Sequence, residues 1–256
     1  MRARLDDEWV LRQLLGRTKA RSTGQEIATI SGMDDPLSEI WPFFNLRLRT
    51  ERLELRVPRP DDLVSLAAMA ALGIHDANTM PFTTEWTDRP APERQRAVLQ
   101  WQWKLRSTLS PDDWTLSFAV VLDGVVVGLQ DIGGTAFSVR REVITGSWLG
   151  RAHQGAGIGK AMRSAVLGLA FEKLGAEHAI STAREDNVAS NRVSAGVGYQ
   201  PDGTEVHVVR GRAVRVQRYR MSRDDWFDRE RPTVLVENLD PCLPILGIVA
   251  TEPLRS

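Results

Sequence analysis

A glycine-rich run between a predicted strand and a predicted helix has the residue types and spacing that binding chemistry requires. It reads Ser147-Trp148-Leu149-Gly150-Arg151-Ala152-His153-Gln154-Gly155-Ala156-Gly157-Ile158-Gly159. Glycines at alternate positions let a backbone approach a ligand closely, and N–H groups at the start of a helix converge with the helix dipole on an anion. The run therefore predicts a site for a pyrophosphate group.

Two common phosphate-binding motifs do not fit this run. A dinucleotide-binding fingerprint built on Gly155 and Gly157 needs a third glycine at position 160, where the chain has Lys160. A P-loop ending at Gly159 and Lys160 needs a glycine at position 154, where the chain has Gln154. The pyrophosphate is therefore expected to belong to a ligand of another class.

Three motifs in this part of the chain carry a family resemblance. The spacing Gln154-x-x-Gly157-x-Gly159 resembles the pyrophosphate loop of the GCN5-related N-acetyltransferase (GNAT) superfamily, and it lies between a strand and a long helix as it does there. Downstream, Asn187-x-x-Ser190 and Gly198-Tyr199 resemble the second cofactor segment and the closing glycine-aromatic pair of that family. Together they make the resemblance more specific than one short loop would.

Within the superfamily, one group resembles this chain most. Trp148-Leu149 before the loop and the run 187–191 look most like the group that acetylates the N-termini of ribosomal proteins. The resemblance covers about residues 50–222 and is strongest over residues 143–200. It leaves both ends of the chain unexplained.

The resemblance implies an N-acetyltransferase that moves the acetyl group of acetyl-CoA directly to a primary amine, either a protein N-terminus or a small molecule. Alternatives are an N-acyltransferase that uses succinyl-CoA or another acyl-CoA, and a non-catalytic acyl-CoA-binding module. The residues implied to hold the cofactor are Trp148, Leu149, Gln154, Gly155, Ala156, Gly157, Ile158, Gly159, Lys160, Asn187 and Ser190.

Three of these residues also suit purely structural roles. Trp148 can fill a large buried site at a strand end, or it can lie beside the cofactor channel. Asn187 can cap the helix that starts at Val188, and Ser190 can satisfy a backbone group in its first turn. Capping does not exclude a position beside the cofactor.

Acyl transfer to an amine needs a neutral nitrogen, a polarised thioester carbonyl and a departing thiolate. The resemblance implies that a free backbone N–H near Trp148 or Leu149 polarises the carbonyl. An α-amine has a pKa of about 8 and a lysine one of about 10.4, so an N-terminal substrate needs a general base less. Candidate bases are Asp131, Glu142 and His75, although both carboxylates also suit solvated strand ends.

The proton donor to the leaving thiolate departs from the family pattern. Many members of the superfamily place a tyrosine four residues before the glycine of the glycine-aromatic pair, where this chain has Ser194. We expect Ser190, or a water held by Asn187, to supply the proton instead. No covalent enzyme intermediate is expected, because Cys242 lies in a proline-bracketed tail far in sequence from any helix N-terminus that would lower its pKa.

Composition excludes several partners. The chain has 33 basic and 33 acidic residues, whereas nucleic-acid and anionic-membrane binders usually carry a basic excess. One cysteine and four histidines without ligand spacing predict neither an internal disulfide nor a metal site. The apolar run near the N-terminus is too short for a signal peptide or a membrane span. We expect a soluble cytoplasmic protein without nucleic-acid or membrane partners.

Hydrophobic patterning predicts a mixed α/β fold with helices and strands in a defined order. The resemblance adds that the central sheet is mostly antiparallel, splayed at the cofactor site and covered by helices on both faces. Strands are expected at 52–57, 117–122, 125–129, 143–149, 178–182, 204–209 and 214–221. Helices are expected from Asp61 and at 93–107, 158–174 and 188–196, with an ordered loop at 74–92.

The chain length suits one catalytic domain with extensions. We assign residues 1–45 to a loosely ordered extension, of which 1–32 are loosely attached, and residues 46–228 to the catalytic domain. The tail 229–256 is too apolar to be solvated. We expect it to cover the acyl or acceptor pocket or to contact a partner subunit, and a homodimer is compatible with it.

Overall fold

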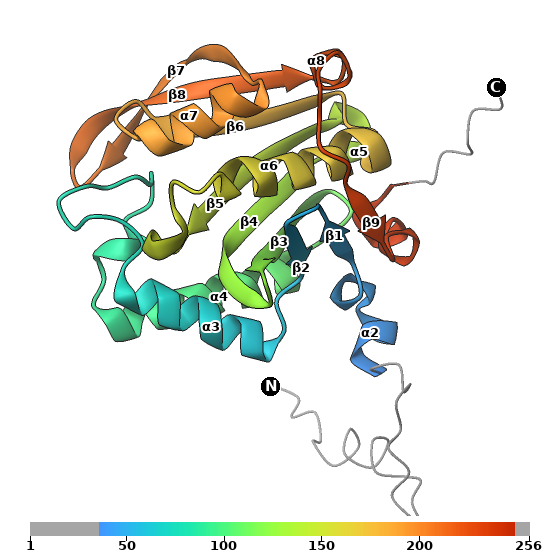
Figure 1. Cartoon of the computed structure of the whole chain (residues 1–256), viewed down its shortest axis with the longest axis horizontal. Coiled ribbons are helices and arrows are strands. Elements are labelled where there is room, and N and C mark those ends of the chain that lie inside the picture. Colours follow the sequence, from blue (N-terminus) through green and yellow to red (C-terminus); the bar gives the residue numbers. More distant parts are fainter. Residues whose placement is uncertain (1–35, 249–256) are drawn as a thin grey trace, which may run out of the picture. The chain divides into compact units, whose positions relative to one another are not determined.

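The structure is a computed structural model that describes residues 36–248, in which a nine-stranded sheet is flanked by helices (Figure 1). The strands are β1 (Arg47–Arg49), β2 (Leu53–Arg56), β3 (Asp113–Leu122), β4 (Val125–Thr135), β5 (Glu142–Leu149), β6 (His178–Arg184), β7 (Gln200–Val209), β8 (Arg212–Ser222) and β9 (Leu235–Glu237). The helices are α2 (Pro36–Ile40), α3 (Pro60–Leu72), α4 (Ala91–Thr108), α5 (Phe137–Arg140), α6 (Ile158–Gly168), α7 (Val188–Val197) and α8 (Arg223–Phe227). The predicted loose attachment of residues 1–32 falls outside the described residues.

The sheet is mostly antiparallel, as predicted. Its strand order is β7-β8-β6-β5-β4-β3-β2-β1-β9. Within it, β5 and β6 pair in parallel, and every other neighbouring pair is antiparallel. The predicted fold class is confirmed, and the one parallel pair lies between the strands that frame the glycine-rich run.

Helices cover both faces of the sheet because successive strand residues point to opposite sides. In β3, Phe118 and Val120 belong to the main core, which also contains the buried side of α6. The residues that alternate with them, Ala119 and Val121, belong to a second cluster with residues of α3 and α4. Two separate apolar layers therefore sandwich the sheet, with α6 on one face and α3 and α4 on the other.

The helix predicted after the glycine-rich run is present, and its apolar stripe is buried. Met162, Ala165 and Val166 of α6 are almost fully inaccessible to solvent. The predicted helix continues as a wider π-helical turn, Leu169–Leu174, and ends at Gly175, whose positive φ of 71° suits a helix C-terminus. This buried stripe fixes the helix, and hence the loop before it, against the sheet.

One strand is much longer than its pattern predicts. The second strand of the hairpin, β4, continues to Thr135 instead of ending near Leu129. Its later part contains Gly133 and Gly134, which weaken a strand pattern. A Cβ on Gly133 would lie 2.7 Å from the Thr115 hydroxyl, so glycine is needed there for close contact with β3.

The N-terminal boundary of the ordered domain lies earlier than predicted. Residues 36–45 were expected in a loosely ordered extension, but they form α2 and a 3₁₀ turn, Pro42–Phe44. Phe43 is only 1% exposed, and the guanidinium of Arg59 stacks on the ring of Phe44. These aromatic side chains anchor the segment, so the expectation is wrong for this part of it.

The described part of the C-terminal tail is built into the main core. The short strand β9 pairs with β1, which also pairs with β2. Leu239, Cys242, Leu243, Leu246 and Ile248 are all buried in the main core. Four strands separate β9 from β5 in the sheet, so this part of the tail does not lie over the glycine-rich run. Burial also raises the pKa of the Cys242 thiol to about 12, which does not suit a nucleophile.

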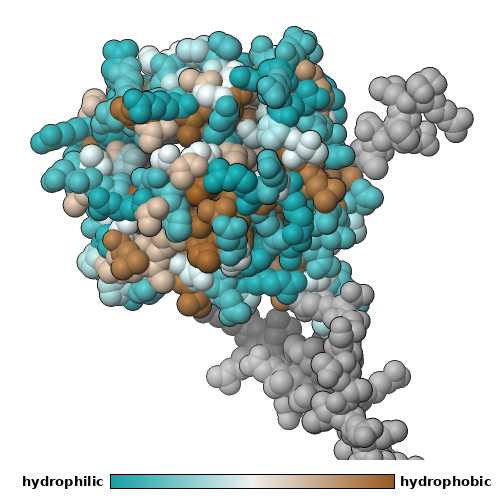
Figure 2. Space-filling model, in the orientation of Figure 1, coloured by the Kyte–Doolittle hydropathy of each residue, from teal (hydrophilic) through white to brown (hydrophobic). Residues whose placement is uncertain are grey.

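Most of the surface in view is hydrophilic, with a hydrophobic strip near the middle of the face (Figure 2). None of the helices between residues 36 and 248 is both long and apolar enough to cross a membrane.

We predict that the tail contributes stability and not catalysis. Leu246→Ala should lower the free energy of unfolding by about 2–5 kcal/mol, because the side chain is fully buried and its removal leaves a cavity. Urea unfolding and steady-state kinetics of the same preparation would measure both effects. Leu235→Ala, at a tail side chain that is 55% exposed, should change stability by less than about 0.5 kcal/mol. A raised KM in Leu246→Ala would instead support a tail that covers the pocket.

Candidate active site

The parallel strands β5 and β6 separate in the middle of the sheet. Their pairing runs from Glu142–His178 to Thr145–Ser181 and then stops. Beyond that point β5 remains paired with β4 up to Leu149, and β6 remains paired with β8 up to Arg184. The two strands therefore form a V that is open toward the glycine-rich run. Backbone groups on the inner edges of this V lack a strand partner and are available to a ligand.

The open end of the V leads into a cluster of free backbone donors. Residues 151–153 form a 3₁₀ turn after β5, and Gly157 is the N-cap of α6. No backbone N–H from Gly155 to Gly159 donates a hydrogen bond within residues 36–248. These N–H groups and the N-terminal end of the α6 dipole favour an anion. The geometry fits the predicted pyrophosphate.

Glycine is needed at each of these three loop positions for a separate physical reason. Gly155 and Gly157 have φ angles of 79° and 78°, in the left-handed region where a side chain is strained. Gly159 has a different role, because a Cβ there would lie 3.2 Å from a methyl group of Val193 on α7. Two glycines thus shape the donor cluster, and the third lets α7 approach α6.

Two predicted cofactor residues use their side chains to brace the site. The Gln154 amide donates to the carbonyls of Ile74 (2.8 Å) and Leu149 (2.9 Å), which ties the loop to β5 and to the segment after α3. Asn187 Oδ1 accepts from the Ser190 N–H at 3.1 Å, so Asn187 caps α7, and its amide nitrogen donates to the Pro81 carbonyl. The structural role foreseen for Asn187 is therefore present.

The segment between α3 and α4, residues 73–90, is an ordered loop beside the V. Besides its bonds to Gln154 and Asn187, it contacts the β7–β8 hairpin. The Arg210 guanidinium makes two hydrogen bonds to the Asp88 carboxylate, at 2.8 and 2.5 Å, and the Arg210 backbone N–H donates to Glu85. Hydrogen bonding to Arg210 holds the pKa of Asp88 below its usual value. The loop is therefore held from three sides.

Asp131 is the predicted base that lies at the V. It faces Gly146 across the β4–β5 pair, one residue beyond the last β5–β6 pairing. Its carboxylate accepts a hydrogen bond from Ser117 at 2.5 Å and another from the side chain of Trp101 on α4. Burial outweighs these bonds and raises the pKa of Asp131 to about 6. Asp131 is thus ionised at neutral pH and can still accept a proton efficiently.

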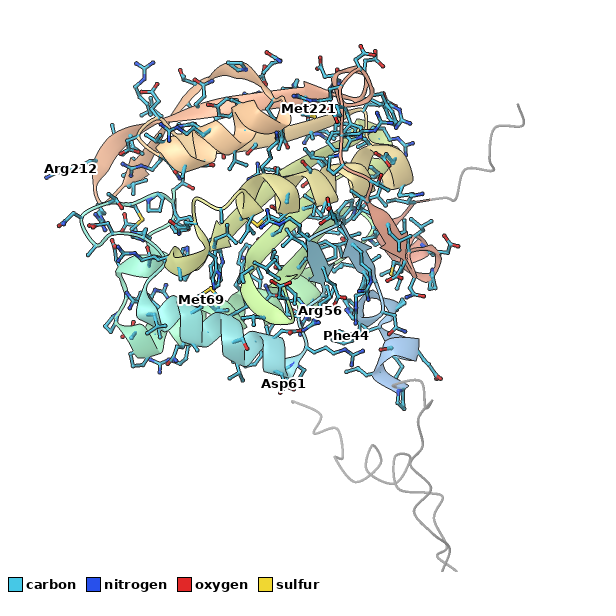
Figure 3. The ribbon with its side chains drawn as sticks, in the orientation of Figure 1. Phe44, Arg56, Asp61, Met69, Arg212 and Met221 are labelled. Atoms are coloured by element: carbon cyan, nitrogen blue, oxygen red, sulfur yellow. The ribbon has the colours of Figure 1, made fainter. Side chains whose placement is uncertain are left out.

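The sheet surface beside Asp131 is open and lined by aromatic rings. Gly146 is exposed, and a Cβ added there would meet no atom within 4 Å. Trp148 lies on the same face of β5, two residues along, and its ring is 6.0 Å from that of Trp86 in the loop. Trp148 is half-buried against the α3–α4 cluster, so it is both a core residue and a wall of this opening. Figure 3 labels Met69 of α3, whose side chain abuts Gly150 at the end of β5.

Other predicted catalytic residues are placed differently. Glu142 forms ion pairs with Arg140 (2.5 Å) and Arg220 (2.7 Å) at the paired end of β5, so its geometry does not favour a role as base. Both ring nitrogens of His75 hydrogen bond within the loop, to Asp76 and Thr87. Ser190 lies half-buried in the first turn of α7, and Lys160 is exposed in the first turn of α6.

A buried polar network on the α6 face was not predicted. Arg163 donates to the hydroxyls of Ser181 on β6 (2.8 Å) and Ser147 on β5 (3.2 Å). The Tyr199 hydroxyl lies 3.1 Å from that of Thr145 and also interacts with the guanidinium. The only trace of it in the sequence is an arginine among the apolar residues of the predicted helix 158–174, and its partners come from distant segments.

Comparison with known proteins identifies the family. A sequence model of the acetyltransferase (GNAT) domain matches residues 52–200, more than half of the chain. The chain belongs to the GNAT acetyltransferase family. It is therefore an acyl-CoA-dependent acyltransferase, and the predicted resemblance is confirmed.

Solved structures share the GNAT fold. The chain is 22% identical to Mycobacterium smegmatis RimJ in complex with CoA-disulfide, with a TM-score of 0.57 over 70% of this chain and 87% of that one. The ribosomal-protein-S5-alanine acetyltransferase from Vibrio fischeri is 18% identical, with a TM-score of 0.54 over 70% of this chain and 98% of that one. A RimL ribosomal L7/L12 alpha-N-protein acetyltransferase in complex with coenzyme A is 17% identical, with a TM-score of 0.55 over 68% of this chain and 95% of that one.

No group of three or more His, Cys, Asp or Glu side chains able to hold a metal ion occurs among residues 36–248. The GNAT site described above is built from backbone donors, glycines and a carboxylate.

We predict that Gly157→Val abolishes coenzyme A binding. A β-branched residue is strained at a φ of 78°, and relief of that strain would move the N–H groups of the loop. Isothermal titration calorimetry with coenzyme A measures the effect. Gly203→Val is the matched control, because Gly203 has a φ of 90° and open space around it but lies in β7. Equal loss of affinity in both variants would show that the effect is general destabilisation.

Proposed function

We propose that this GNAT enzyme transfers the acetyl group of acetyl-CoA to a primary amine. The observation that carries the proposal is the position of Asp131 beside the apex of the V, on the face opposite α6. It brings an ionised carboxylate next to the open surface at Gly146, while the free N–H groups of Gly155–Gly159 mark the pyrophosphate end of the same V. Donor and acceptor can therefore meet in one place.

The proposed reaction is direct. The amine approaches over Gly146, its nitrogen attacks the thioester carbon, and its proton passes to Asp131 directly or through one water. A β5 backbone N–H on the inner edge of the V stabilises the negative charge on the carbonyl oxygen. The carbon–sulfur bond then breaks, and its electron pair leaves with the sulfur as the coenzyme A thiolate. The half-buried environment strengthens each of these interactions.

A protein N-terminus is the acceptor we favour. The residues 73–90 loop and the aromatic rings of Trp86 and Trp148 flank the opening beside Asp131, an arrangement that suits the end of an extended chain. An α-amine with a pKa of about 8 also needs little help from a base whose pKa is about 6. The names of the RimJ, RimL and S5-alanine acetyltransferase structures point the same way.

A thiol-release assay tests the function. Purified protein is incubated with acetyl-CoA or succinyl-CoA and with peptides that have free N-termini, peptides with blocked N-termini and an internal lysine, or polyamines. We expect release from acetyl-CoA that depends on the free N-terminus. Release from succinyl-CoA alone would contradict the acetyl donor. Coenzyme A binding without release across the panel would contradict catalysis and support a binding module.

We predict that Asp131 sets the acid limb of the pH profile. In the wild type, kcat should fall as the pH decreases through about 6, because protonated Asp131 cannot accept the amine proton. Asp131→Asn should lower kcat by about 10²–10⁴-fold and remove this limb. Initial rates with a saturating peptide between about pH 5 and pH 9 measure both effects.

Glu142→Gln is the control for that prediction, since this carboxylate is ion-paired away from the V. It should keep the acid limb and most of the activity. An unchanged acid limb in Asp131→Asn would show that another group titrates.

The contribution of Asp131 to fold stability should depend on pH in the opposite direction to its contribution to activity. Because its folded pKa is raised above that of an unfolded aspartate, the group favours folding at low pH, and this contribution is lost as the pH rises through about 6. At pH 8 Asp131→Asn should therefore be at least as thermostable as the wild type, while it loses activity. A Tm well below that of the wild type would indicate a carboxylate needed for structure.

A further inference from the structure

Arg163 is a buried cation without an anionic partner in the described structure. Its side chain is 3% exposed, and no carboxylate from residue 36 to residue 248 lies within 4.0 Å of the guanidinium. Arginine keeps its charge at neutral pH even though burial lowers the pKa of Arg163. A buried charge that lacks a counter-ion is costly to the fold. Its retention therefore requires a compensating role.

Arg163 lies at the apex of the V. The two terminal nitrogens of Arg163 reach Ser181, in the last β5–β6 pair, and Ser147, two residues beyond that pair on β5. The guanidinium thus bridges the two strands where they part. Asp131 lies on the opposite face of the sheet, because it packs against Ser117 and α4.

The polar atoms around the guanidinium are incompletely satisfied. Nε of Arg163 has no hydrogen-bond partner, and neither has the buried Oε1 of Gln130, which faces Ser147 across the β4–β5 pair. The Ser147 oxygen accepts from Arg163, so its own proton is free to donate elsewhere. Ser147 is only half-buried, and it is therefore the member of the network that a group in the V can reach.

We propose that Arg163 is a positioning residue that stabilises the departing thiolate through Ser147. When the carbon–sulfur bond breaks and its electron pair moves to sulfur, the Ser147 hydroxyl donates a hydrogen bond to the sulfur and keeps its proton. The guanidinium polarises that O–H bond and lowers the energy of the negative charge nearby. The inference rests on the proposed acyl transfer. It assigns to Ser147 the stabilisation of the leaving thiolate, which in many members of the family falls to a tyrosine at the position of Ser194.

The decisive measurement is the pKa of the coenzyme A thiol in the complex. A thiolate absorbs in the ultraviolet and a thiol does not, so a pH titration of bound coenzyme A reports the pKa without any turnover. We expect the bound pKa to lie at least about one unit below that of free coenzyme A, a tenfold shift toward thiolate. Arg163→Met should abolish the shift, Ser147→Ala should reduce it, and Arg163→Lys should retain part of it.

The variants that change the pKa of the bound thiol should also change kcat. Arg163→Met should lower kcat with acetyl-CoA by about 10–100-fold and change KM for acetyl-CoA by less than about threefold, since the loss falls on charge that develops during the reaction. Arg106→Met is the matched control. Arg106 is also a partly buried arginine with an unpartnered Nε, but it bonds the Pro58 carbonyl away from the V. It should leave the bound thiol pKa and kcat unchanged.

Two results would overturn the proposal. One is a folded Arg163→Met variant with the thiol pKa and kcat of the wild type. If Arg163→Met does not fold, Ser147→Ala decides, and a bound thiol pKa in that variant equal to that of the wild type has the same meaning. A shifted thiol pKa in a wild-type protein that acetylates no amine would contradict the proposed function and leave the Arg163 assignment in place.

Discussion

The parting of β5 from β6 after the Thr145–Ser181 pair is the constraint on which the whole site depends. A sheet loses ladder hydrogen bonds when two strands separate, and buried backbone groups must then find other partners. This chain keeps the separation because each strand remains fixed on its far side, β5 by β4 and β6 by β8. The binding space is therefore a property of the sheet topology, and side chains only refine it.

Charge is arranged across this opening in a way that matches the reaction. Asp131 of β4 lies on the α4 face, opposite Gly146 of β5, and Arg163 lies on the α6 face, where it contacts the next residue of β5, Ser147. During acyl transfer, positive charge develops on the amine and negative charge on the sulfur. A carboxylate on one face and a cation on the other favour that separation, and their partial burial makes both interactions stronger than they would be in water.

Sequence patterns predicted the parts of the site that depend on local structure. The glycine spacing, the long apolar stripe of α6 and the capping role of Asn187 each involve residues within a few positions of one another, and periodicity or turn chemistry reveals them. The Arg163 network joins residues on α6, β5 and β6 that only the fold brings together, so no spacing rule signals it. Three-residue strands such as β1 and β9 are likewise too short to leave a pattern.

The loop at residues 73–90 is held in place by contacts that are distant in the sequence. Its own sequence has little periodicity, yet it is ordered, because Gln154 and Asn187 bind its carbonyls from segments some 80 to 106 positions away. Its third attachment, the Arg210–Asp88 pair on the β7–β8 hairpin, is more exposed and hence individually weak. The two amide attachments therefore keep the loop beside the V, and the contact with the hairpin adds less.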